Sequence, residues 1–208
     1  NIQKFLQTDN KKCYISGSKE LKENHVCFLR QGVEFNLKQS FIAAMADIYS
    51  KMTGVGRGGG FLITHMKEII IDSLSDRNFM TFKKGTLVTL FGKKITNKAE
   101  YYDKVKSARE NFSNFLRDDD IDIDYEYLWD IFSIPNEKLF RNGINIVIFN
   151  IPDDDITDNI EIICSNDTIF DIKKPTVFLM KKDKFYEPIY GYTSVGDNIE
   201  ITPSFLYD

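Results

Sequence analysis

The sequence predicts an α+β protein in which a helical part precedes a sheet. Between residues 40 and 117, apolar side chains recur with the period of a helix. From residue 144 onward, short β-branched and aromatic runs have the length of strands. Helices that come first and strands that come second are typical of a helical layer packed on a mostly antiparallel sheet, here built from the C-terminal half.

Three longer helices are expected, at residues 40–52, 64–75 and 98–117, each with an apolar stripe. The stretch "GVGRGGG" at 54–60 separates the first two, because five glycines in seven residues disfavour any regular element. It is not a phosphate-binding loop, since Phe61-Leu62 follows where that motif needs Lys and Ser or Thr. We expect a loop here, or a junction across missing residues.

An acidic stretch, "RDDDIDIDYEY" at 117–127, is expected to be a solvated loop. Neither it nor "IPDDDITDN" at 151–159 has the spacing of a calcium-binding loop. One or two short helices follow around Pro135, with Trp129 in the core, and Asn142-Gly143 ends them. The expected strands are 144–151, 160–165, 176–182 and 186–192, with a further strand in the tail.

The composition bounds the classes of protein to which the chain can belong. Hydrophobic residues make up 42% of the 208 residues, which is enough for a core. The formal charge is −4 and no basic stripe is present, which argues against nucleic acid as the main ligand. No apolar run approaches the length of a membrane span, so no membrane contact is expected. The chain begins at Asn1, and we expect it to be a segment of a longer protein.

The cysteines and histidines are few and scattered. Cys13, Cys27 and Cys164 are widely separated, and His25 and His65 are the only histidines. A structural zinc site needs about four such ligands at close spacings. We therefore expect no metal and no cofactor, and reduced thiols in an intracellular compartment.

Ser40 stands at the start of the first expected helix. Serine is a favoured helix cap, and this is the simplest interpretation. A helix N-terminus also suits a nucleophile, because its exposed N–H groups and dipole favour a developing anion.

Three stretches resemble the OTU (ovarian tumour) family of ubiquitin-cleaving cysteine peptidases, which have a papain-like fold. "SFIAAMAD" resembles the family's helix, whose motif is Asp-Gly-x-Cys-Leu-Phe-x-Ala-x-Ala-Asp. "FLMKKDKFYEPIY" resembles its late strand pair, and "YLWDIFSIPNEKLFRNGINIVIF" resembles the segment between. The resemblance spans roughly residues 33–192 and implies an OTU-like domain at 36–208, with residues 1–35 as an extension packed on it. The chain is also similar to uncharacterised proteins of large eukaryotic DNA viruses.

The resemblance implies that the catalytic positions are degenerate. Ser40 occupies the position of the family's nucleophilic cysteine. Leu37 occupies the position of the acid that supports the oxyanion site, and Phe185 that of the histidine base. Glu187 is the one matching residue of the four, because it is an acid at the position that would orient that histidine. Loss of a triad's base removes on the order of 10⁴–10⁶ of the rate, so no catalytic residue is expected.

The leading functional prediction is a non-catalytic OTU-like module that binds a protein partner, either ubiquitin-like or a viral structural protein, in host cytoplasm or a virion. One alternative is an active ubiquitin-directed peptidase or hydrolase that uses Ser40 or the nearby Cys27, with His25 or His65 as base. A second alternative is a structural component of a virion or a viral transcription complex. The relative positions of residues 40 and 185 discriminate among these hypotheses.

Overall fold

The structure is a computed structural model that describes residues 13–56, 61–93, 100–152, 159–164 and 169–207. Its helices are α2 (Ser40–Thr53), α3 (Ile63–Ser73), α4 (Asp76–Phe79), α5 (Thr86–Phe91), α6 (Tyr101–Arg117) and α7 (Tyr125–Ser133). Its strands are β1 (Cys27–Arg30), β2 (Asn145–Ile151), β3 (Glu161–Cys164), β4 (Thr176–Lys182), β5 (Phe185–Val195) and β6 (Asn198–Thr202).

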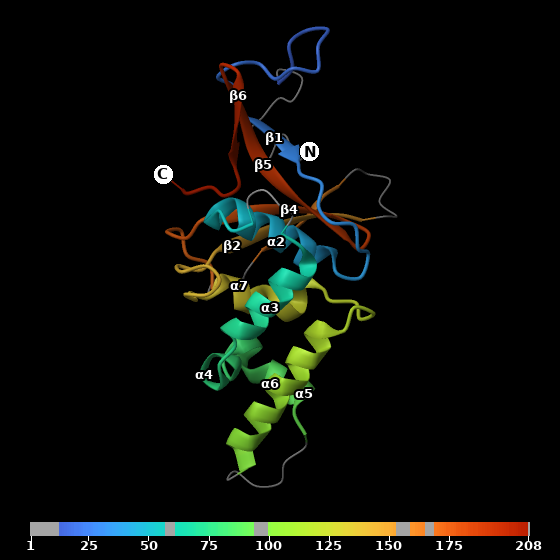
Figure 1. The fold of residues 1–208 in the computed structure, drawn as a ribbon, viewed down its shortest axis with the longest axis vertical. Helices are drawn as coiled ribbons and strands as arrows, with labels where there is room; N and C mark the ends of the chain where they lie inside the picture. Colours follow the sequence, from blue (N-terminus) through green and yellow to red (C-terminus); the bar gives the residue numbers. More distant parts are fainter. Residues whose placement is uncertain (1–12, 57–60, 94–99, 153–158, 165–168, 208) are drawn as a thin grey trace.

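The molecule is elongated, with helices at one end and a narrow ribbon of strands at the other (Figure 1). Helices α3 to α6 form the helical end, and β1, β5 and β6 form the ribbon. Helix α2 crosses the sheet between these two ends and packs on β5.

The six strands form one mixed sheet in the order β1-β5-β4-β2-β3, with β6 also paired to β5. The pair β2–β4 is parallel, and the others are antiparallel. The prediction of an α+β fold with a mostly antiparallel sheet is confirmed. One part of it is wrong, because β1 comes from the N-terminal region and so the sheet is not built from the C-terminal half alone. Strand β1 joins the extension predicted at 1–35 to the sheet, while residues 1–12 lie outside the described residues.

Both faces of the sheet carry apolar side chains, because apolar residues stand at successive positions of its inner strands. Ile146 and Ile148 of β2 belong to the main core under the helices, whereas Val147 and Phe149 belong to a smaller cluster. Successive side chains of a strand point to opposite faces, so the smaller cluster lies on the face away from α2. Phe205 of the C-terminal segment lies against Phe178 of this cluster, with ring centroids 5.4 Å apart.

The three longer helices lie within about three residues of their predicted bounds. The first ends at Gly54, whose φ of 78° places it in the left-handed region that glycine favours. The rest of the predicted glycine loop, residues 57–60, lies outside the described residues. Helices α4 and α5 and the 3-10 helix Phe82–Gly85 were not predicted, because elements of four to six residues are too short to show a period.

Phe41 anchors α2 at the point where the helices meet the sheet. Its fully buried ring makes edge contacts with Tyr125, Phe132 and Tyr186. We expect Phe41→Ala to lower the free energy of unfolding in urea by about 3–5 kcal/mol, because the cavity cannot be refilled. Leu90→Ala, at a largely exposed position of α5, is the control and should change it by less than about 0.5 kcal/mol. An equal effect of the two changes would contradict the assigned core.

Candidate functional site

Ser40 lies against the first residues of β5. Its hydroxyl donates to the carbonyl of Lys184, with Oγ and O 2.7 Å apart, and accepts from the N–H of Tyr186 at 3.3 Å. The residue is only 2% exposed. The prediction that Ser40 caps its own helix is wrong, because Gln39 holds the cap position and the serine hydroxyl crosses to the sheet.

The structure therefore brings residues 40 and 185 together, although their side chains do not meet as a nucleophile and base would. Ser40 contacts the backbone on both sides of Phe185. Tyr186 faces α2, so strand alternation places Phe185 and Glu187 on the opposite face. The ring of Phe185 packs on that of Phe35, with centroids 5.6 Å apart.

Of the other two predicted positions, Glu187 is partly buried and Leu37 is exposed. The carboxylate of Glu187 pairs with the Arg30 guanidinium of β1, with Oε2 and Nη1 2.9 Å apart. Leu37 precedes α2 and is exposed. Glu187 thus has a cation as its partner, whereas the predicted role would give it an imidazole.

Beside Ser40 lies a polar network centred on Tyr186. The Tyr186 hydroxyl donates to the Asp124 carboxylate, which also pairs with Lys181 at 3.4 Å. The Lys181 ammonium lies over the rings of Tyr125 and Tyr186, 5.4 and 5.3 Å from their centroids. Burial and the nearby carboxylate raise the pKa of the Tyr186 hydroxyl, which therefore stays protonated and cannot act as a base.

The network borders a cavity of about 340 Å³ whose lining includes Ser40, Tyr186, Lys38 and Lys184. Three carboxylates, Asp122, Asp124 and Glu126, also line it. Most of these charges already have partners within the protein. The cavity holds a neutralised polar cluster and no free nucleophile.

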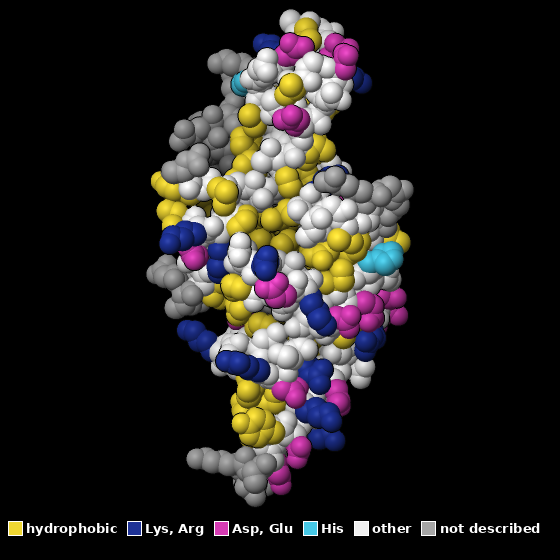
Figure 2. All heavy atoms as spheres, turned by 60° about the vertical axis from the view of Figure 1, so that its left-hand side comes forward, with side chains coloured by type: hydrophobic (Ala, Val, Ile, Leu, Met, Phe, Trp, Pro, Cys, Tyr) yellow, Lys and Arg dark blue, Asp and Glu magenta, His cyan; other side chains and the backbone are white. Residues whose placement is uncertain are grey.

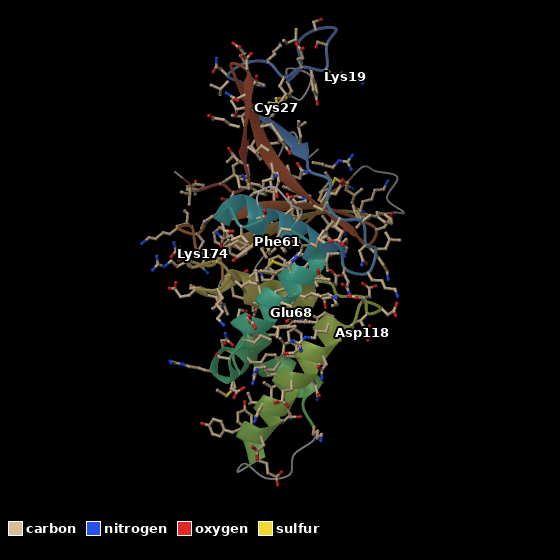
Figure 3. The ribbon with its side chains drawn as sticks, viewed as in Figure 1. Lys19, Cys27, Phe61, Glu68, Asp118 and Lys174 are labelled. Carbon is tan, nitrogen blue, oxygen red and sulfur yellow. A yellow bond between two sulfur atoms is a disulfide. The ribbon has the colours of Figure 1, made fainter. Side chains whose placement is uncertain are left out.

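The acidic stretch between α6 and α7 is a loop with mostly exposed aspartates, as predicted, but ion pairs also tie it to other parts of the protein. Asp119 pairs with Lys67 of α3 at 2.8 Å. Asp120 pairs with Lys38, and Asp122 pairs with Lys184. Sequence reasoning missed these pairs because their lysines lie far away along the chain. Figure 3 places Asp118, at the start of this stretch, beside the end of α6.

Neither histidine can serve as a base for Ser40 in this arrangement. His65 lies at the start of α3, where its Nδ1 accepts from the N–H of Leu62 and its ring stacks on Phe61. His25 lies next to the Cys13–Cys27 disulfide. Because Cys27 is in this disulfide, it has no free thiol to act as the alternative nucleophile. Figure 2 shows histidine side chains at two separate places on one face.

Cys13 and Cys27 form a disulfide, so the expectation of reduced thiols is wrong for these two residues. Cys164 is a free thiol, as expected, and the structure shows that it is exposed. The ligand atoms of Cys13, His25 and Cys27 all lie within 4.8 Å of one another, and both cysteines are fully buried. The spacing His-x-Cys at 25–27 was a signal for this cluster, because it places two metal-ligand side chains close together along the chain.

A second cavity, of about 550 Å³, lies between the C-terminal part of α2 and the segment that leads into β2. Its lining includes Tyr49, Met52, Phe140 and Pro175, and the sequence did not predict it. Trp129 is 9% exposed and belongs to the core, as predicted.

The fold and the site thus define an α+β protein with an enclosed polar cluster at the junction of helix and sheet. Comparison of the chain with protein-family models found no match, and comparison with curated proteins found none either. In the described residues, no helix combines the length and the apolar character that crossing a bilayer requires.

The Ser40 hydroxyl is expected to be a structural group. We expect Ser40→Ala to lower the free energy of unfolding by about 1–3 kcal/mol, because it leaves the buried Tyr186 N–H unpaired. Ser50→Ala is the matched control, since Ser50 also lies on α2 and donates to a backbone carbonyl, that of Val55, but at an exposed position. Urea unfolding of both variants measures the difference, and equal stability of Ser40→Ala and wild type would refute the role.

The Asp119–Lys67 ion pair makes the free energy of unfolding depend on pH in the acidic range. Hydrogen bonding and attraction to the Lys67 ammonium lower the pKa of Asp119 below its ordinary value of 3.8. The pair's stabilisation is therefore complete above that value and disappears as the pH falls through the lower pKa of the folded state. We expect Asp119→Asn to unfold more easily than wild type at neutral pH, and the two curves of unfolding free energy against pH to converge in strong acid.

The control for this prediction is Asp120→Asn, because Asp120 pairs with the half-exposed Lys38 whereas Lys67 is buried. Its effect on the free energy of unfolding should be the smaller, since hydrated pairs contribute little. A constant difference between wild type and Asp119→Asn down to strong acid would show that this carboxylate is not the cause.

Proposed function

We propose that the chain is a non-catalytic, OTU-like module that binds a ubiquitin-like protein. The observation that carries the proposal is the state of Ser40, the residue at the nucleophile position of the resemblance. Its hydroxyl is enclosed and donates to a backbone carbonyl, so no base is available to take its proton. The position of the base is held by Phe185, which is a hydrocarbon ring.

The same region offers an apolar contact surface. Phe35 is 76% exposed and lies against Phe185, and we call these two side chains the aromatic pair. Exposed aromatic residues are enriched at protein interfaces, where they supply a large apolar area with few rotatable bonds. The pair lies at the β4–β5 turn, next to the segment that leads into α2.

The absence of catalysis is tested with ubiquitin chains and with a ubiquitin probe that carries a thiol-reactive group. We expect no cleavage of the chains, because no base faces Ser40. We also expect no labelling of Cys13 or Cys27, which are buried in a disulfide. Cys164→Ser is included because Cys164 is exposed and would react nonspecifically. Chain cleavage that is lost in Ser40→Ala would overturn the proposal.

Binding is tested by titration of the chain with ubiquitin, measured by calorimetry. We expect Phe35→Asp to weaken binding by about tenfold or more, which corresponds to about 1.4 kcal/mol. Tyr102→Asp is the matched control, because Tyr102 is a similarly exposed aromatic residue but lies on α6 at the helical end. Equal loss in both variants would rule out the aromatic pair as the anchor. Failure of the unmodified chain to bind would exclude ubiquitin as the partner, and a viral structural protein would then be the class to test.

A further inference from the structure

The cluster of Cys13, His25 and Cys27 lies in the ribbon, away from Ser40, and the proposed function makes no use of it. Figure 3 labels Cys27 in the ribbon, at the other end of the molecule from the helices. We propose that, when its disulfide is reduced, this cluster binds Zn²⁺ through the two cysteine thiolates and the imidazole of His25.

The donor set suits zinc. Two thiolates and one imidazole bind Zn²⁺ better than they bind hard cations such as Mg²⁺ and Ca²⁺. A fourth coordination position remains for water or another donor. Tetrahedral coordination with Zn–S bonds of about 2.3 Å places ligand atoms roughly 3.8 Å apart. All three ligand atoms already lie within 4.8 Å of one another, so only a small adjustment is needed once the sulfurs separate.

His25 provides an independent observation. Its Nε2 is buried and has no hydrogen-bond partner among the residues that the structure describes. An enclosed nitrogen without a partner is costly, and a disulfide offers it nothing. A metal ion between the two sulfurs and the ring would satisfy a nitrogen of His25 and so explain why a histidine stands beside two cysteines.

The backbone around the cluster is held in place before any metal binds. The N–H of Lys22 donates to the carbonyl of Cys13 at 2.8 Å, and Tyr14 forms a bridge with Leu21. Cys27 is the first residue of β1 and lies opposite Tyr192 of β5. The three ligands thus come from a hairpin and from the entry to a strand, so the site does not depend on the disulfide alone for its shape.

The oxidised and metal-bound forms exclude each other. A dithiol reductant delivers two electrons and two protons to the Cys13–Cys27 bond, which becomes two thiols while the reductant becomes a disulfide. Zn²⁺ then displaces both thiol protons, and two Zn–S bonds replace the S–S bond. In the reverse direction a small-molecule disulfide takes two electrons from the zinc-bound thiolates and two protons from solvent and becomes two thiols, while the Cys13–Cys27 bond re-forms and Zn²⁺ is released.

The test uses the whole chain, reduced anaerobically with a phosphine and then titrated with Zn²⁺ against a coloured chelator. Cobalt(II) serves as a second probe, since thiolate ligation gives a charge-transfer band and tetrahedral geometry gives strong d–d bands. We expect one equivalent of either metal to bind the reduced chain and none to bind the oxidised chain. The thermal unfolding midpoint of the reduced chain should rise with zinc.

The variants separate this site from nonspecific thiol binding. His25→Asn keeps the disulfide, so its folding can be checked by circular dichroism before reduction. This substitution should weaken zinc binding by about tenfold or more. Removal of a residue that merely hydrogen-bonds to a metal ligand already lowers metal affinity by about tenfold, and loss of the ligand itself should lower it at least as much. Cys164→Ser and His65→Asn remove the other free cysteine and the other histidine and should bind like wild type. The proposal is overturned if the reduced chain shows no thiolate–cobalt band, or if His25→Asn binds zinc as tightly as wild type.

Discussion

The packing of helix α2 on strand β5 is the interaction on which the rest of the structure depends. At the start of the helix the Ser40 hydroxyl joins the backbone of β5, and Phe41 sets its ring edge-on to Tyr186, with centroids 5.3 Å apart. Two turns further along α2, the Asp47 carboxylate accepts a hydrogen bond from the Tyr190 hydroxyl of β5 at 2.6 Å. Burial and this carboxylate raise the pKa of Tyr190, so the donor keeps its proton. Because β5 also pairs with β1, β4 and β6, fixing α2 on it sets the helical layer relative to the whole sheet.

The acidic segment after α6 completes this junction from the outside. The backbone N–H of Ile123 donates to the carbonyl of Lys38 at 2.8 Å, and the buried Gln39 side chain donates to the carbonyl of Asp118 at 2.8 Å. These contacts and the four lysine pairs join segments that are distant in the sequence. Individually the exposed ion pairs contribute little. Together with the backbone contacts, they hold the segment at the start of α2, where it lines the same cavity as Ser40.

The sequence predicted much of the fold because periodicity is a local property. The long helices and the strands of residues 144–202 each contain enough apolar repeats to be recognised. It also led us to compare residues 40 and 185, which the structure brings to neighbouring backbone positions. It could not predict which face of β5 Phe185 would take, because register and alternation depend on pairing with other strands. The lysine–aspartate pairs and the Cys13–Cys27 bond were missed for a similar reason, since each depends on a fold that places separate segments side by side.

The central position of β5 has a consequence for the order in which the chain can fold. Strand β1 pairs with residues near 190, so it cannot join the sheet until those residues, more than 150 positions further along the chain, have been made. Contacts of such large sequence separation slow folding, because a long loop must close before they form. The Cys13–Cys27 bond, in contrast, closes a loop with a sequence separation of only 14. The hairpin that contains Cys13 can therefore be crosslinked to Cys27 early and persist as a preformed unit, and the sheet is completed once β5 and β6 have been made.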